Sequence, residues 1–302
     1  MTSGVPRVEN LEMLSWLTPR QQREREFFDE YWSRYQPPEV DFDVVQGNER
    51  RPWNSYWYVF EAAKQCYQSG ARKLLDFGCG GGAHAVTLAA MGYEVSGFDI
   101  SPRSIETARQ VAAAHGLADR IQLSVQTSER LDYPDNYFDV VVGIDILHHV
   151  EIAPSVAECI RVLRPGGVAF FREFIEVPAF DRVRNTALVR FFFPNTKTLD
   201  LWHHITDDER KLNAQDIAAM RALCPALMET RFHVFARLDR LLRRHGGRGA
   251  SRMEMLDYWL CKKLPALNRL GGSVVLQLTK DVGPTSDAGV SNSRLDLALP
   301  LQ

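Results

Sequence analysis

The segment that decides the fold is Leu74-Leu75-Asp76-Phe77-Gly78-Cys79-Gly80-Gly81-Gly82-Ala83-His84. In it, an apolar strand-like run leads into four glycines, and a helix-like pattern follows them. Glycines permit a tight turn and let a ligand approach the backbone, while a helix N-terminus offers free N–H groups. The segment therefore predicts a ligand-binding strand–turn–helix unit. Alone it is ambiguous, because Gly78-x-Gly80-x-x-Ala83 also satisfies the dinucleotide-binding fingerprint.

Two carboxylates bear on this ambiguity. Asp76 precedes the glycines, where it suits the ammonium group of an amino-acid ligand and would repel a pyrophosphate. Asp99 ends the next strand-like run, Val95–Phe98, and could accept hydrogen bonds from two ribose hydroxyls. NAD sites use a carboxylate in the same way, so Asp99 fits either kind of ligand. Asp76 is therefore the residue that disfavours a dinucleotide.

Strand-like and helix-like segments alternate through the middle of the chain. This alternation predicts a doubly wound, Rossmann-like α/β fold with a seven-stranded, mostly parallel sheet and helices on both faces. Ser101, Pro102 and Gly116 mark the start and end of one helix clearly. Strands are expected at 73–77, 94–98, 120–125, 138–144, 167–175, 230–237 and 273–279, and helices at 83–91, 102–115, 152–162 and 214–222.

The flanking segments differ from this core. Residues 1–70 predict an N-terminal helical cap, with a helix that starts at Thr18-Pro19 and another at about 53–69. A domain is expected at 71–280, and inserts at about 176–212 and 238–270 interrupt its pattern near the C-terminal strands. Residues 281–302 carry Gly, Pro, Ser, Asp and Asn without periodicity and predict a disordered tail.

Composition narrows the function classes. The 302 residues are 45% hydrophobic and 25% charged, with a net charge of −2, whereas dedicated nucleic-acid binders usually carry a strong basic excess. Five cysteines without a CxxC spacing favour neither a disulfide framework nor a zinc site. The sequence shows no signal-peptide pattern and no apolar run of about 18 residues. A soluble cytoplasmic protein without stable membrane insertion is expected.

Five motifs in order complete the pattern: DFGCGGG (76–82), FDIS (98–101), ERLDYPDNYFDVV (129–141), ILHHV (146–150) and VLRPGG (162–167). This series resembles the class I S-adenosylmethionine (SAM)-dependent methyltransferases. It is most similar to the type 11 set, which includes the ubiquinone and menaquinone biosynthesis methyltransferases. The resemblance covers about residues 72–175, with weaker support from the last strand.

The resemblance implies a role for each matching residue, with SAM as the cofactor. Asp76, Gly78 and Gly80 would hold the methionine part, and Gly82 would allow its close approach. On the nucleoside side, Asp99 would bind the ribose and Ile100 would pack on the adenine. Asp145 and Ile146 would face the methyl group that is transferred. The family usually has an Asp before Glu129 for the adenine amino group, and this chain departs from that pattern with Thr127 and Ser128.

Methyl transfer needs in-line positioning of the acceptor, and a base only where the acceptor loses a proton. The candidate catalytic residues are Glu173, His148 and His149, with His203 and His204 as further candidates. Glu173 ends the fifth strand, where open α/β sheets place their ligands, although an ion pair with Arg172 or another arginine is the structural alternative. The histidine pairs do not predict a metal, because adjacent residues do not share a helix face.

The inserts and the cap are expected to define the acceptor site. Tyr56 and Trp57 would reach the site from the cap, and Phe192, Trp202 and His203 from the first insert, although a small satellite core explains the insert equally well. The second insert holds an arginine-rich stretch that fits an anionic acceptor, a membrane surface or simply a solvated helix face. It comprises Arg237, Arg240, Arg243, Arg244, Arg248 and Arg252.

The function expected from these features is SAM-dependent methylation, at oxygen or carbon, of a lipophilic small molecule such as a phenol, quinone, isoprenoid or lipid-linked metabolite. A nucleic-acid or protein methyltransferase and a non-catalytic SAM-binding subunit are the alternatives. Amino-directed DNA methylation is disfavoured, because no Asn/Asp-Pro-Pro-Tyr/Phe motif follows the fourth strand. The sequence leaves the oligomeric state open.

Overall fold

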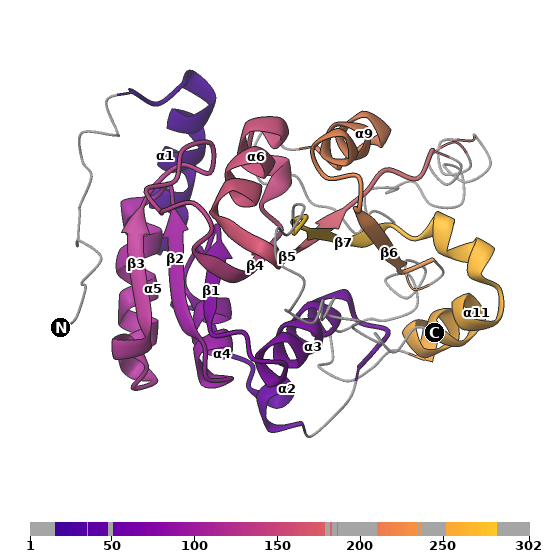
Figure 1. The fold of residues 1–302 in the computed structure, drawn as a ribbon, viewed down its shortest axis with the longest axis horizontal. Helices are drawn as coiled ribbons and strands as arrows, with labels where there is room; N and C mark the ends of the chain where they lie inside the picture. Colours follow the sequence, from indigo (N-terminus) through magenta and orange to yellow (C-terminus); the bar gives the residue numbers. More distant parts are fainter. Residues whose placement is uncertain are drawn as a thin grey trace.

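The computed structural model describes residues 16–34, 36–47, 51–178, 182, 186, 210–234, 236 and 252–282 (Figure 1). Its strands are β1 (Lys73–Phe77), β2 (Glu94–Asp99), β3 (Ile121–Val125), β4 (Phe138–Ile144), β5 (Leu163–Phe174), β6 (Met228–Phe232) and β7 (Ser273–Thr279). The longer helices are α1 (Pro19–Arg34), α3 (Ser55–Gln68), α4 (Ala83–Ala90), α5 (Pro102–Ala114), α6 (Ile152–Val162), α9 (Ala214–Leu223) and α11 (Arg252–Lys263). Short helical segments are α2 (Asp43–Gln46), η2 (Ala118–Arg120), η3 (Leu147–His149) and η6 (Pro265–Leu270).

The seven strands form one sheet in the order β3-β2-β1-β4-β5-β7-β6. The pairs from β3 to β5 are parallel, whereas β7 runs antiparallel to both of its neighbours. This confirms the predicted fold class. The chain winds outward from β1 to β3 and then returns to β4, which places the topological switch between β1 and β4. Open α/β sheets bind ligands outside the carboxyl ends of the strands at such a point.

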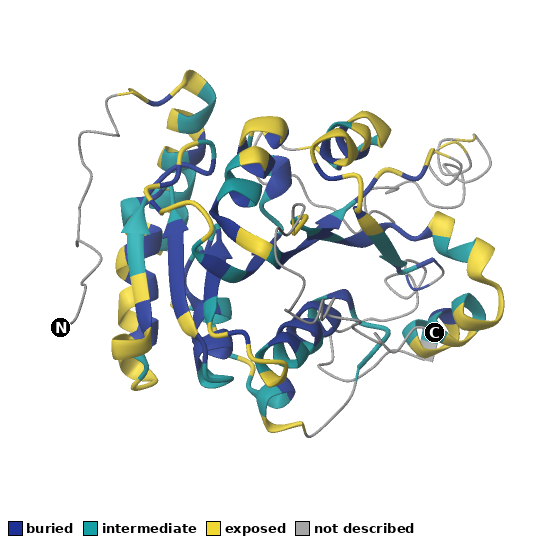
Figure 2. Cartoon of the chain, viewed as in Figure 1, coloured by how far each residue is buried: buried dark blue, intermediate teal, exposed yellow. Residues whose placement is uncertain are grey.

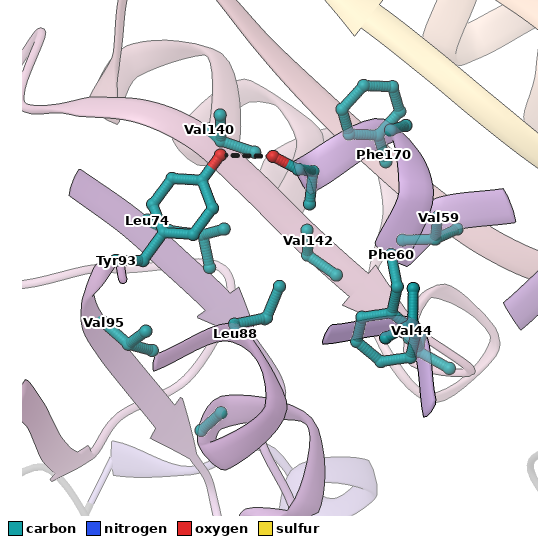
Figure 3. Packing of buried hydrophobic residues seen from close by; sticks show 14 of the residues in the cluster. Val44, Val59, Phe60, Leu74, Leu88, Tyr93, Val95, Val140, Val142 and Phe170 are labelled. Carbon is teal, nitrogen blue, oxygen red and sulfur yellow. Dashed lines mark hydrogen bonds between the residues drawn. The ribbon is translucent and has the colours of Figure 1, made fainter. Parts of the chain in front are cut away.

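Helices cover both faces of the sheet because successive strand residues point to opposite sides. Leu74 belongs to the core under α3 and α4, while Leu75 belongs to the core under α6 and α9. Figure 3 shows the first core, where the Tyr93 hydroxyl donates to the Ala63 carbonyl at 2.6 Å. Each large apolar side chain so buried contributes about 1.5–3 kcal/mol. In Figure 2 the sheet is largely buried and the exposed residues lie mostly on the outer faces of the helices.

Most predicted elements are present, with shifted ends that have local causes. Helix α3 begins at Ser55 because the Asn54 side chain accepts hydrogen bonds from the backbone N–H groups of Tyr56 and Trp57. Strand β6 covers 228–232 instead of the predicted 230–237, and His233, with a φ of 63°, follows its last residue. Strand β5 begins at Leu163, ahead of the predicted 167, because its register on β4 shifts between Phe138 and Val140.

Some predictions fall on other parts of the chain. Most of the first insert and most of the arginine-rich stretch lie outside the described residues. Residues 283–302 lie outside them as well. The part of the second insert that the structure describes contains α11 and η6. Among the helices that are described, none combines the length and the hydrophobicity that crossing a membrane requires.

Gly82 fixes how closely α4 approaches α5. Its φ is 86°, and a Cβ at this position would lie 2.7 Å from both Cα and Cβ of Ala108 in α5. We therefore expect Gly82→Ala to lower the free energy of unfolding by about 2–4 kcal/mol, from backbone strain and overpacking together. Chemical denaturation measures this change.

Gly116→Ala is the matched control. Gly116 also has a positive φ, 68°, but a Cβ there would meet no atom within 4 Å. Gly116→Ala should lower the free energy of unfolding by only about 1 kcal/mol, because backbone strain is its only cost. An equal loss in the two variants would show that the contact between α4 and α5 is not what requires Gly82.

Candidate functional site

A cavity of about 290 Å³ lies at the carboxyl ends of β1, β2 and β4. The loop after β1, the residues after β2, the turn after β4 and helix α1 all contribute to its wall. Its lining includes the predicted residues Gly78, Gly80, Gly82, Asp99, Ile100, Thr127, Ser128, Asp145, Ile146 and His149. The structure thus brings most of the predicted site together at the topological switch.

The glycine loop forms one wall of the cavity. Gly78 and Gly80 have φ values of 78° and 49°, which residues with side chains rarely adopt. A Cβ on Gly78 would lie 2.6 Å from the Ile146 side chain, so the loop packs directly against the turn after β4. A Cβ on Gly80 would meet nothing within 4 Å. Gly80 therefore leaves room for a ligand against the backbone.

Asp99 stands at the end of β2 and lines the cavity. Its Oδ2 accepts the Gly80 N–H at 3.1 Å and its Oδ1 accepts the Ser101 N–H at 2.9 Å. Burial raises the pKa of this carboxyl above its usual value, while these two hydrogen bonds act in the opposite direction. Each oxygen keeps a further acceptor site, so the carboxylate can still receive two hydroxyl groups.

Asp76 is buried behind this wall and is not among the lining residues. The backbone N–H of Ala85 in α4 donates to its carboxyl group, while Oδ2 has no hydrogen-bond partner among the described residues. Burial, and next the charge of Asp99, raise the pKa of Asp76 from 3.8 to about 7. An unpaired carboxylate oxygen at this depth would be stabilised by a cation bound nearby.

Helix α1 covers the cavity with one face. Its lining residues Gln21, Glu24, Phe28 and Trp32 are spaced three or four positions apart, as residues on one side of a helix are. A Cβ on Gly81 would lie 2.5 Å from the Trp32 ring, so only glycine allows this close contact. Polar contacts fix the helix as well: the Gln21 amide donates to Glu129 at 2.9 Å.

The turn after β4 is held by Glu173. This carboxylate is fully buried and accepts the N–H groups of Ile146 and Leu147 at 2.8 and 2.6 Å, while His148 Nδ1 lies 2.7 Å from its other oxygen. Neither Glu173 nor His148 lines the cavity. His149 does, and its Nδ1 lies 3.0 Å from Glu24 of α1. The structural alternative of an ion pair between Glu173 and Arg172 does not occur, because neighbouring strand residues face opposite sides.

Arg172 instead forms a buried cluster at the end of the cavity beside Asp145. The guanidinium pairs with Asp145, donates to Ser55 Oγ at 3.1 Å, and lies between the rings of Tyr56 and Phe174, 4.2 and 4.0 Å from their centroids. The Tyr56 hydroxyl donates to Asp145 at 2.7 Å. Burial raises the pKa of Tyr56, which keeps it protonated.

Asp145 itself has a φ of 55°, and its backbone N–H donates to the Arg172 carbonyl at 2.9 Å. A left-handed conformation is uncommon for a residue with a side chain, and such residues concentrate at functional sites. The surrounding contacts with Arg172 and Tyr56 maintain this conformation. They hold the Asp145 carboxylate in a fixed position at the cavity wall.

The remaining predicted residues lie elsewhere. Tyr56 reaches the cavity only through Asp145, and Trp57 is buried in the core under α3. Phe192, Trp202, His203 and His204 lie outside the described residues. After β3, the Ser128 hydroxyl lies 2.9 Å from that of Ser155, and Thr127 lines the cavity. No cluster of metal-binding side chains occurs in the described ranges.

The sequence interpretation missed several lining residues: Gln21, Glu24, Phe28, Trp32, His84 and Gln126. His84 lies in the first turn of α4, and burial lowers its pKa, with Asp145 and Arg172 among the charges that act on it. A signal existed for the α1 residues, because their helical spacing is visible in the sequence. The aromatic helices of the cap are expected to cover the cofactor site, but the sequence does not indicate which face of α1 would turn toward the glycine loop.

The sheet order, the glycine loop and the carboxylate at the end of β2 together define the fold of the class I SAM-dependent methyltransferases. The solved [4+2]-cyclase SpnF shares this fold, with a TM-score of 0.51 and 20% identity over 88% of this chain and 98% of that one. Residues 75–171 match the family described as methyltransferase domain. The chain thus carries a class I SAM-dependent methyltransferase domain, as the sequence motifs predicted, and SAM is the cofactor of this class.

Curated relatives match over the same region. A 27-O-demethylrifamycin SV methyltransferase from Amycolatopsis mediterranei (strain S699) is 37% identical over 109 residues, which are 35% of this chain and 40% of that protein. A ubiquinone biosynthesis O-methyltransferase from Thiobacillus denitrificans (strain ATCC 25259 / T1) is 32% identical over 145 residues, or 48% of this chain and 59% of the relative. The chain spans about half the length of these relatives.

The buried acid Asp76 gives a test by pH. Because its pKa is raised in the folded protein, the unfolded chain loses this proton first, and the folded state loses stability as pH rises from 3.8 to about 7. We expect Asp76→Asn to stabilise the ligand-free protein, by on the order of 1–3 kcal/mol above that range, and the gain to vanish toward the lower limit. Chemical denaturation across this range measures it.

The same variant should bind a cationic ligand less tightly. Affinity for S-adenosylhomocysteine should rise in the wild type as pH rises through about 7, since Asp76 then becomes ionised, and should stay flat in Asp76→Asn. Asp119→Asn, which removes an exposed carboxyl, is the control for net charge. A stability gain that does not depend on pH would contradict the raised pKa.

Proposed function

We propose that this protein transfers a methyl group from SAM to an oxygen or carbon atom of a lipophilic small molecule. One observation carries the proposal: a single cavity joins the glycine loop and Asp99 to the strained Asp145 at the end of β4. The glycine loop and Asp99 suit a nucleoside that carries an amino acid. Asp145 suits the group that reacts with this ligand at the end of β4. Phenols, quinones, isoprenoids and lipid-linked metabolites are the acceptor classes considered.

The cavity residues fit SAM part by part. Asp99 would accept hydrogen bonds from the ribose hydroxyls, and Ile100 would pack on the adenine, whose edge Thr127 and Ser128 would face. Gly78 and Gly80 would hold the methionine part, because Gly80 leaves the backbone open at that point. The ionised form of Asp76 would favour the ammonium group from behind the loop. When bound, SAM supplies a methyl group that its sulfonium already activates.

The chain's own residues would then orient the acceptor and move its proton. Tyr56 and Arg172 fix the Asp145 carboxylate, which faces the cavity where the methyl group would lie. Two histidines line the same cavity: His149, paired with Glu24, and His84, whose pKa burial lowers. Either can take a proton from a hydroxyl acceptor. Glu173 and His148 act as positioning residues in this proposal, because they bond one another beneath the turn.

The lipophilic character of the acceptor rests on two supports. Apolar side chains contribute much of the cavity wall, among them Phe28, Trp32, Pro38, Ile144, Ile146 and Val150. The names of the relatives describe O-methylation of a rifamycin derivative and in ubiquinone biosynthesis.

Thermal stability in the presence of ligands tests cofactor binding. SAM and S-adenosylhomocysteine should raise the Tm of the wild type by an amount that grows with the logarithm of their concentration above Kd, whereas NAD should not. Asp99→Ala should lower the affinity for SAM and for S-adenosylhomocysteine at least about tenfold, because two charge-assisted hydrogen bonds are lost. Stabilisation by NAD instead would exclude a SAM site, and methyl transfer to none of the acceptor classes despite tight SAM binding would exclude the proposed acceptors.

Tyr56→Phe tests the acceptor side. Without the hydroxyl, the Asp145 carboxylate loses one of the contacts that fix it, so kcat for methyl transfer should fall by about tenfold with little change in S-adenosylhomocysteine affinity. Tyr58→Phe is the matched control on the same helix, because its hydroxyl faces Thr230 at 3.4 Å. Equal losses in both variants, or a parallel loss of cofactor affinity, would contradict a role for Tyr56 in positioning the acceptor.

A further inference from the structure

Helix α11 exposes a face that combines apolar and cationic side chains. The exposed residues of this helix whose side chains are described are Met255, Leu256, Trp259, Lys262 and Lys263. At 3.6 residues per turn, these positions fall within an arc of about 120°, so they form one stripe along the helix. We call this stripe the α11 outer face. It contains no acidic residue.

The opposite face of α11 attaches the helix to the domain, and it carries both of the acids of the helix. Asp257 is buried and accepts the Ala236 N–H at 2.8 Å, and Glu254 lies 3.6 Å from His233. The Tyr258 ring lies against Trp53, with 6.2 Å between the centroids. The outer face therefore has a fixed direction, and its charge is positive because the acids point inward.

The exposed apolar residues are concentrated here. Among the described residues, nine large apolar side chains are exposed, and four of them are Met255, Leu256, Trp259 and Leu264, the last directly after the helix. Trp259 and Leu264 are 52% and 55% exposed, and the Lys263 ammonium lies 4.4 Å from the centroid of the Trp259 ring. Exposed apolar residues that cluster in this way mark an interaction surface, whereas scattered ones need no explanation.

We propose that the α11 outer face docks on an anionic lipid surface. A tryptophan and aliphatic side chains flanked by lysines are the composition with which interfacial helices enter the headgroup region, while the lysines contact anionic headgroups. A symmetric dimer through this face would bring the lysines of two copies together, and that repulsion disfavours a second copy as the occupant. The contact is peripheral, because no described helix is long and apolar enough to span the membrane.

The position of α11 relates this surface to the candidate acceptor site. Trp53, which contacts Tyr258 of α11, immediately precedes Asn54, the cap of α3. The next two residues, Ser55 and Tyr56, hold Arg172 and Asp145 at the end of the cavity. Docking would thus place the lipid surface next to the acceptor side, so that a lipophilic acceptor could enter from it. This last step, unlike the docking itself, rests on the proposed function.

Flotation of the full chain with vesicles tests the docking. At low ionic strength, the protein should bind vesicles made of equal parts phosphatidylcholine and phosphatidylglycerol, and bind phosphatidylcholine vesicles more weakly. The double variant Lys262→Gln/Lys263→Gln should lower the affinity for the anionic vesicles by about 30-fold, since each lysine near such a surface contributes about fivefold. Trp259→Ser should lower affinity for both kinds of vesicle.

Trp16→Ser is the matched control, because Trp16 is 77% exposed but precedes α1, far along the chain. It should bind anionic vesicles as the wild type does. Thermal stabilisation by S-adenosylhomocysteine, measured on the same samples, establishes that each variant is folded and separates docking from cofactor binding. Three outcomes would overturn the proposal: absence of vesicle binding by the wild type, unchanged binding by Trp259→Ser, or a wild-type dimer in solution that Trp259→Ser dissociates without any binding to vesicles.

Discussion

The geometry of the site depends on one buried carboxylate. Glu173 accepts the N–H groups of Ile146 and Leu147 and contacts the ring of His148, so it satisfies the polar groups on the buried side of this turn. An unsatisfied buried N–H costs about 1–3 kcal/mol, and this turn would leave two of them. Because Ile146 packs on Gly78, the same carboxylate also sets where the glycine loop lies.

Two neighbouring residues at the end of β5 point to opposite sides of the strand and stabilise different parts of the site. Glu173 faces the turn after β4, while Arg172, one position earlier, faces the opposite side and pairs with Asp145. The two charges therefore stabilise separate groups instead of one another. Arg172 is sandwiched between two aromatic rings, which lets a guanidinium remain buried while its polar edge binds Ser55 and Asp145.

Local patterns in the sequence were sufficient for the sheet, the glycine loop and Asp99, because strand ends, glycine turns and helix caps are fixed by neighbours along the chain. The residues that were missed depend on contacts between distant segments. Glu24 meets His149 across 125 positions, and no local pattern indicates that pair. Glu173 was recognised as special, but its partners are backbone N–H groups, which a sequence does not distinguish from any others. Tyr56 and Trp57 are both predicted at the site as aromatic residues of the cap, but adjacent helix residues face about 100° apart, and Trp57 lies in the core.

The position of β7 has a consequence for how the protein is made. It is the last of the described strands along the chain, yet it lies between β5 and β6 in the sheet, and it pairs with Arg172 and Glu173 through Val275 and Val274. During synthesis, β5 therefore remains an open edge until residues 273–279 have left the ribosome. Open edges recruit strands from other chains. A nascent protein that stalls before this point has every cavity residue in place along the chain, but exposes the strand that carries both buried charges, and would be a natural client for a chaperone.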